Sequence, residues 1–272
     1  MKIVTSGELL LDIAKSAQAL GREDILLTLK DDRLVTMVKG VENTTMFAAR
    51  VPDKGMKEYD SGDKDEIALP VNKIVDFSPK KAEQITLEYE DHEFHLSNGQ
   101  YTATFNAVNT DYVEGVMEQT IKTDWPIEVS AKKLKINDFI NTAQSVVGEE
   151  TFIVGGREDG LYLMSKLDDS ELHTRIKWED FEDINNDWAM LGDDLGERKT
   201  DSVFSTDFFN SLHLPSDPPG GYTMNFGDNC PMRLIAKKTA GVELLYILTP
   251  RIKSGSTSRI MEIPDRVTDQ YN

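Results

Sequence analysis

Cysteine is almost absent from this 272-residue chain, which contains Cys230 alone. A single cysteine excludes an internal disulfide and a thiolate metal cluster. No apolar run approaches the roughly 18 residues that a membrane-spanning helix needs. The N-terminal sequence lacks the apolar core and the cleavage site of a signal peptide. We therefore expect a cytoplasmic protein with no membrane partner.

Basic residues are also scarce. Lysine and arginine together number 30 against 48 aspartates and glutamates, and the net charge is -18. This charge argues against a protein that coats nucleic acid with its whole surface, although it leaves room for a small basic patch. Solubility or adaptation to a salty cytoplasm are the simpler explanations of the excess acid.

Catalytic motifs are missing as well. The chain has no Walker A loop, no G-x-G-x-x-G after a strand, no G-x-S-x-G and no H-E-x-x-H. His92 and His95 fall in a charged hairpin that is typical of a solvated turn, and Cys230 has no base at a predictable position. The sequence predicts no catalytic residue, no metal and no cofactor.

An internal duplication organises the chain. Leu10, Ile13 and Ala14 fall at helical spacing in residues 5–20, and the same spacing recurs 126 residues later in residues 131–146. Thr5 with Glu8 is expected to form a capping box at the first helix. The full stripes are Leu10, Ile13, Ala14, Ala17 and Leu20, and then Ile136, Phe139, Ile140, Ala143 and Val146.

Each copy reads as helix, strands, helix, strands, and the strands alternate apolar and polar residues, which buries one face. The predicted fold is α+β, with two similar domains that each pack two helices on antiparallel β-sheet. The acidic stretch 179–200 is predicted to be a solvated loop. We expect domains at 1–108 and 127–252, a connector at 109–126 and a flexible tail at 253–272.

The segment 231–252, PMRLIAKKTAGVELLYILTPRI, resembles the closing segment of sliding clamps of the PCNA family. Pro231 opens a strand, Ala240 and Gly241 form a small-residue turn, and Thr249-Pro250-Arg251 stands where the family has an A-P-K-like sequence. The resemblance covers about residues 1–252, and Thr249 departs from the common alanine. It implies the DNA-clamp fold, closing into a ring of three identical subunits.

The resemblance also implies a function. A sliding clamp is not an enzyme: it encircles duplex DNA without reading sequence, tethers a DNA polymerase and other replication proteins, and needs an ATP-driven clamp loader. Helices line the hole and sheets form the outer wall. The implied DNA-facing residues are Lys15, Arg22, Lys73, Lys80, Lys81, Lys132 and Lys133.

Subunits of such a ring pair their sheet edges, here Tyr101–Val108 and Leu172–Trp178. Partner peptides insert into a pocket under the connector. The implied edge residues are Tyr101, Thr104, Phe105, His173, Arg175 and Lys177. The implied pocket residues are Asn43, Thr44, Val116, Met117, Ile121, Pro126, Pro231, Thr249 and Pro250.

Three alternatives stay open at this point. A checkpoint-type clamp subunit would share the fold and assemble with two different partners. An acidic two-domain binding module, or DNA mimic, would explain the net charge of -18 and would scatter its lysines. An enzyme with an unrecognised site is the third, and the empty motif search argues against it.

Overall fold

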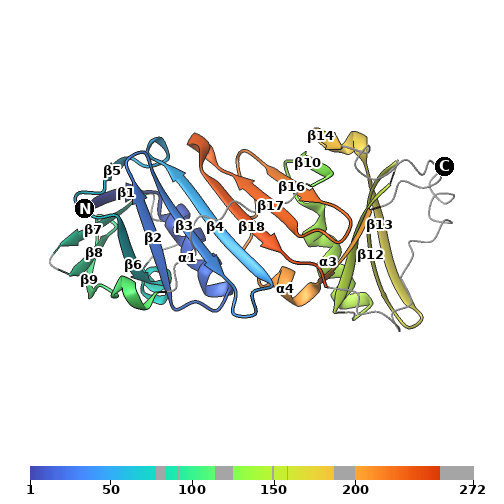
Figure 1. Ribbon diagram of the computed structural model, residues 1–272, viewed down its shortest axis with the longest axis horizontal. Helices are drawn as coiled ribbons and strands as arrows, with labels where there is room; N and C mark the ends of the chain where they lie inside the picture. Colours follow the sequence, from blue (N-terminus) through green and yellow to red (C-terminus); the bar gives the residue numbers. More distant parts are fainter. Residues whose placement is uncertain are drawn as a thin grey trace.

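The computed structural model describes residues 1–77, 84–90, 92–113, 125–148, 150–157, 159–186 and 200–251 of the chain. Within these ranges the strands form antiparallel sheets, and the labelled helices lie behind them in Figure 1. This is the α+β class that the alternating patterns predict. None of the described helices is long and apolar enough to cross a membrane.

The first half of the chain contains helices α1 (Gly7–Ala19) and α2 (Val71–Phe77) and the short 3-10 helices η1 (Asp53–Gly55) and η2 (Thr110–Tyr112). Its strands are β1 (Lys2–Thr5), β2 (Asp24–Lys30), β3 (Arg33–Lys39), β4 (Thr45–Pro52), β5 (Glu58–Asp60), β6 (Glu66–Pro70), β7 (Ile85–Glu90), β8 (Glu93–Ser97) and β9 (Thr102–Asn106).

The second half contains helices α3 (Lys135–Val146) and α4 (Thr206–Asn210), with the 3-10 helices η3 (Trp178–Asp180) and η5 (Thr239–Gly241). Its strands are β10 (Ile127–Ala131), β11 (Thr151–Arg157), β12 (Gly160–Leu167), β13 (Ser170–Lys177), β14 (Asp183–Asn186), β15 (Thr200–Ser205), β16 (Tyr222–Phe226), β17 (Met232–Lys237) and β18 (Glu243–Leu248).

The strand order repeats between the two halves. A five-stranded sheet has the order β5-β1-β7-β8-β9, and a four-stranded sheet has the order β13-β12-β11-β15. Between them a nine-stranded sheet runs β14-β10-β16-β17-β18-β4-β3-β2-β6. Its first five strands repeat the five-stranded order, and its last four repeat the four-stranded order. Each half therefore contributes one set of five and one set of four strands.

The two halves join where β18 pairs with β4. Tyr246 lies opposite Phe47 in this ladder, and their ring centroids are 5.3 Å apart. Both rings are almost fully buried. Because burial of an aromatic side chain contributes several kcal/mol and an aromatic pair adds about 1 kcal/mol, this junction belongs to the core of the chain.

An ionic cluster around the buried Asp12 also joins the two halves. Lys238 Nζ lies 2.6 Å from Asp12 Oδ2 on α1 and 2.7 Å from Glu8 Oε1, while His213 Nε2 lies 3.4 Å from Asp12 Oδ1. Burial acts to raise the pKa of Asp12, but the hydrogen bonds and charges of His213 and Lys238 outweigh it, so the pKa lies below its ordinary value. Burial acts to lower the pKa of Lys238, and its two carboxylate partners raise it overall.

The start of α1 differs from the sequence prediction. Ser6, and not Thr5, caps the helix, since the Leu9 N–H donates to Ser6 Oγ over 3.1 Å. Thr5 is the last residue of β1, where it lies opposite Ile85 in the ladder. Because α1 begins at Gly7, the N-cap position falls on Ser6, one residue after Thr5.

The acidic stretch 179–200 was predicted as a loop, but part of it is structured. Residues 178–180 form η3, and β14 (Asp183–Asn186) pairs with β10. A four-residue edge strand is too short to show a clear alternation, which explains why the sequence pattern misses it. Residues 187–199 lie outside the described part of the chain.

Candidate functional site

Two strand edges lie at opposite ends of the long axis, β9 at one end and β13 at the other (Figure 1). Among the described residues, β9 pairs with β8 alone and β13 pairs with β12 alone. On β9, Thr102 and Thr104 are exposed, whereas Ala103 and Phe105 are half-buried. These edges contain most of the predicted interface residues; Tyr101 is 62% exposed and precedes β9.

Side chains on β13 are held by their own chain. Arg175 Nη1 lies 2.5 Å from Asp159 Oδ2, and the Tyr162 hydroxyl donates to the same carboxylate over 2.7 Å. Burial acts to raise the pKa of Asp159, but these hydrogen bonds lower it overall. His173 Nδ1 lies 3.4 Å from Glu171, and Lys177 Nζ lies 3.3 Å from Glu179. The edge is thus preorganised by internal ion pairs.

The helix face that the resemblance assigns to DNA has charges of both signs. Lys73 on α2 is exposed and Lys15 on α1 is half-buried. The Gln18 side-chain amide donates to Asn72 Oδ1 over 2.8 Å, which ties α1 to α2. Exposed acids on the same four helices are Glu8, Asp76, Asp138 and Asp207. The exposed surface of helices α1 to α4 therefore has both acidic and basic side chains.

The other predicted DNA contacts have varied surroundings. Arg22 Nε donates to the Lys39 carbonyl over 2.7 Å, so its side chain supports the end of β3. Lys132 is exposed and lies 3.4 Å from Glu182. Lys80 and Lys81 fall outside the described residues.

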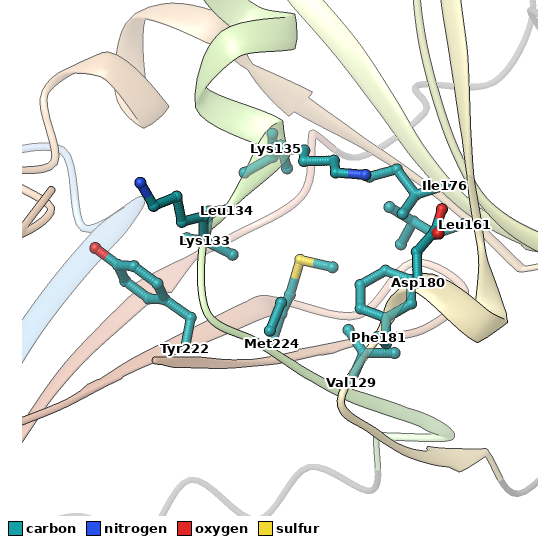
Figure 2. A pocket seen from close by; sticks show the side chains of 12 residues that line it. Val129, Lys133, Leu134, Lys135, Leu161, Ile176, Asp180, Phe181, Tyr222 and Met224 are labelled. Atoms are coloured by element: carbon teal, nitrogen blue, oxygen red, sulfur yellow. The ribbon is translucent and has the colours of Figure 1, made fainter. Parts of the chain in front are cut away.

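Lys133 lies at the rim of a hollow in front of α3. Figure 2 shows its ammonium group pointing away from the apolar side chains of Met224 and Phe181 that fill the interior. A matching hollow in the first half is lined by Ile3, Leu10 and other residues of the repeat. Because the same space recurs in both halves, we interpret it as the gap between the two sheets of each core rather than as a ligand site.

Part of the predicted partner pocket comes together at one end of the junction between β18 and β4. Thr44 O accepts hydrogen bonds from the backbone N–H of Thr249 over 2.8 Å and from its hydroxyl over 3.0 Å. Pro231 precedes Met232, which lies opposite Leu248 in the ladder. Asn43 is an exposed turn residue with φ of 56°, and Pro250 is half-buried beside Thr249.

Trp125 is a site residue that the sequence reasoning missed. Its indole N–H donates to the Pro231 carbonyl over 2.6 Å, and the Arg233 guanidinium lies 4.2 Å from its ring centroid. This contact fixes the end of the predicted connector, where Pro126 is buried, against Pro231, one of the residues predicted to line the pocket. An aromatic residue next to proline in an otherwise polar segment was the available signal.

The predicted roof of the pocket cannot be placed. Val116, Met117 and Ile121 lie outside the described residues. Within the described ranges, no group of three or more histidine, cysteine, aspartate or glutamate side chains is arranged to hold a metal ion.

No family model matches the chain, and no curated protein matches it in sequence. Among solved structures, A. fulgidus PCNA bound to the C-terminal region of FEN-1 superimposes with a TM-score of 0.79 at 19% identity, covering 93% of this chain and 99% of that one. The chain has the fold of a PCNA sliding clamp.

Two further PCNA structures support this fold. PCNA from Thermococcus kodakaraensis matches with a TM-score of 0.74 at 14% identity, and covers 92% of this chain and 99% of that chain. The PCNA2–PCNA3 complex from Sulfolobus tokodaii matches with a TM-score of 0.74 at 15% identity and the same coverage. The predicted clamp fold is confirmed, and the likeness to archaeal PCNA extends over nearly the whole chain.

Proposed function

We propose that this chain is a subunit of a ring-shaped sliding clamp that encircles duplex DNA and tethers replication proteins. One observation supports it most directly. The edges β9 and β13, each paired on one side only in the described part of the chain, hold the same places in the repeat as β18 and β4, which pair with each other. A head-to-tail contact between β9 of one copy and β13 of the next would therefore repeat a junction that the chain already contains, and it closes into a ring when the rotation is suitable.

The repeat also predicts the register of this contact. Ala103 occupies the place of Tyr246, and Leu172 the place of Phe47, as the neighbouring ladders define. Tyr246 lies opposite Phe47. We therefore expect Ala103 to lie opposite Leu172 of the next copy. The same shift places Thr102 opposite His173 and Thr104 opposite Glu171.

A disulfide tests the register and the ring together. In a chain with Cys230→Ser, Thr102→Cys combined with His173→Cys should give a covalent three-chain species under mild oxidation. Residues directly opposite in an antiparallel ladder have Cα atoms about 5 Å apart, within the range of a disulfide. The measurement is a non-reducing denaturing gel.

The matched control is Thr104→Cys with His173→Cys, in which the two cysteines are diagonal and about 7–8 Å apart. It should link far more slowly. A chain that stays monomeric at micromolar concentration and forms no cross-link in either variant would contradict a ring of identical subunits. Faster linking in the diagonal pair would contradict the register alone.

The proposed DNA contact is weak and electrostatic. Lys15 and Lys73 would contact the phosphates of DNA inside the hole of the ring. The exposed Asp76 and Asp138 would weaken the electrostatic attraction between the helices and the DNA. Such a face suits a ring that slides, because strong attraction to phosphates slows movement along DNA and is not needed when topology prevents release. Loading onto DNA would require a separate ATP-driven loader.

The proposed partner site is the pocket beside Pro250. Pro250→Glu should weaken binding of a labelled peptide from the C-terminal region of A. fulgidus FEN-1 by about 1–3 kcal/mol, since a charge replaces a rigid apolar wall. Pro219→Glu is the matched control, because Pro219 is exposed in the loop at the opposite end of β17. Fluorescence anisotropy measures both, and equal affinity for the two variants would move the site elsewhere.

A ring that combines this chain with different subunits is the second candidate. The Sulfolobus tokodaii structure pairs two distinct PCNA chains. Here β9 reads TATFN where β18 reads ELLYIL, so the outer edge is more polar than the inner junction. The cross-linking experiment on the purified chain separates the homotrimer from a ring that needs other subunits.

A further inference from the structure

An apolar cluster lies on the outward face of the four-stranded sheet, separate from the main core. Ile153, Tyr162 and Met164 are buried together, with Val203 packed against them. Their strand neighbours Phe152, Val154 and Leu163 belong to the main core. Because successive residues of a strand point to opposite faces, this outward cluster faces away from the core, yet its three buried members are only 1–3% exposed.

The first half of the chain lacks this degree of burial at the same places. Leu26 and Met37 correspond to Ile153 and Met164 in the repeat, as the two hairpins define. Both are only half-buried. Val35, the counterpart of Tyr162, is itself buried, and the Arg157 guanidinium lies 6.0 Å from the Tyr162 ring centroid. The difference between the two halves therefore concerns Ile153 and Met164.

The chain leaves β18 directly beside this cluster. The Arg251 N–H donates to the Val203 carbonyl over 2.8 Å. In the first half, Val108 bridges Ala68 at the corresponding place, and the chain continues into η2 beside β6. Arg251, the last described residue, thus lies at the edge of β15, one strand from Ile153 and two strands from Met164.

We propose that the C-terminal segment 252–272, which lies outside the described residues, docks on the outward cluster. Its apolar residues Ile260, Met261 and Ile263 supply the side chains that fit an apolar face. Nine extended residues from Arg251 to Ile260 span up to about 30 Å. Crossing from β15 to β12 requires only about 10 Å, since neighbouring strands lie about 4.8 Å apart.

The charged residues around the cluster are compatible with a peptide that crosses the sheet. Arg157 pairs with Asp201 over 2.8 Å, and Arg175 pairs with Asp159. These neutralised pairs frame the apolar surface without adding net charge. Docking there would also hold the residues that follow Pro250, while Thr249 before it is already held by Thr44. The proposed pocket wall at Pro250 would then be fixed on both sides in the sequence.

Methionine oxidation tests the docking on the whole chain. In the full chain Met164 should resist peroxide, and in a chain that ends at Arg251 its oxidation rate should rise roughly tenfold, because oxidation follows exposure. Met224, in the core, should stay protected in both chains, and half-buried Met37 should react in both. Peptide mass spectrometry reads all three sites in one sample.

A charge-matched pair of variants separates docking from general damage. Ile260→Asp, Met261→Asp and Ile263→Asp together should expose Met164 as truncation does. Ser254→Asp, Ser256→Asp and Ser258→Asp add the same charge and should leave Met164 protected. Unchanged Met164 protection in the truncated chain would overturn the proposal.

Two other occupants give different results. If Met164 becomes reactive when residues 187–199 are replaced by a short glycine-serine linker, but not on truncation, that loop covers the cluster and the proposal is wrong. If protection in the full chain is lost on dilution, a second copy covers the face, and the proposal is again wrong. Neither result depends on whether the chain forms a DNA clamp.

Discussion

Replacing Lys238 with methionine should lower the free energy of unfolding by about 3 kcal/mol at pH 7. The substitution leaves Asp12, which is 8% exposed, with His213 as its remaining ionic partner across the junction of the two halves. A buried carboxylate that loses its main cation is costly because the protein interior solvates charge poorly. Guanidinium titration followed by circular dichroism measures the loss.

Lys237→Met is the matched control. Lys237 is half-buried on the neighbouring position of β17, and we expect its replacement to cost less than about 0.5 kcal/mol. Adding Asp12→Asn to Lys238→Met should recover part of the loss, because removing both charges leaves neither unpaired. Equal costs for Lys237→Met and Lys238→Met would show that the ionic cluster does not stabilise the junction.

The cluster also predicts a dependence on pH. The pKa of Asp12 in the folded chain lies below its ordinary value of 3.8. Its charge therefore stabilises the fold at every pH above that value, and the contribution disappears as the pH falls through the folded pKa. The difference in unfolding free energy between the wild-type chain and Asp12→Asn should accordingly shrink below about pH 4.

Ala103→Glu should abolish self-association of the purified chain at micromolar concentration. In the expected register Ala103 faces Leu172 of the next copy, so the variant would bury an unpaired carboxylate against an apolar side chain. The cost of about 3–5 kcal/mol corresponds to a loss of at least a hundredfold in affinity. Sedimentation velocity over a range of concentrations provides the measurement.

Thr102→Glu is the matched variant, because Thr102 lies on the opposite face of β9 and is exposed. Its glutamate would face His173 of the next copy and should leave the ring intact. A ring that survives Ala103→Glu, or one that both variants disrupt equally, would show that the two edges do not pair in the expected register.

Much of the fold could be predicted from the helical stripes and the alternating strand patterns in the sequence. The residues around Leu10 and Ile136 repeat the same spacing, and each stripe packs on a core. Val146 is the exception: it is 62% exposed, and the next residue, Val147, is buried instead. The short strands β5 and β14 were missed because three or four residues show no period. The partnership of Asp12 with Lys238 was also missed, since it requires the packing of α1 from the first half against a turn from the second.

The pocket shows a similar division. Pro231, Thr249 and Pro250 could be named because the segment 231–252 resembles the closing segment of sliding clamps. Trp125 could not, because its contact with Pro231 joins segments 106 residues apart. Contacts of this kind depend on how the elements dock, and no local pattern of residues encodes them.

The pairing of β4 with β18 has a consequence for synthesis. Strand β4 ends at Pro52 and its partner begins at Glu243. At 5–20 residues per second, a ribosome needs roughly 10 to 40 seconds to make the intervening chain. During that time the edge of β4 that will pair with β18 has no partner. The strand already synthesised that corresponds to β18 in the repeat is β9. We expect the small Ala103, which stands in place of Tyr246, to make β9 a weaker partner for β4 than β18 is, and so to favour the native pairing.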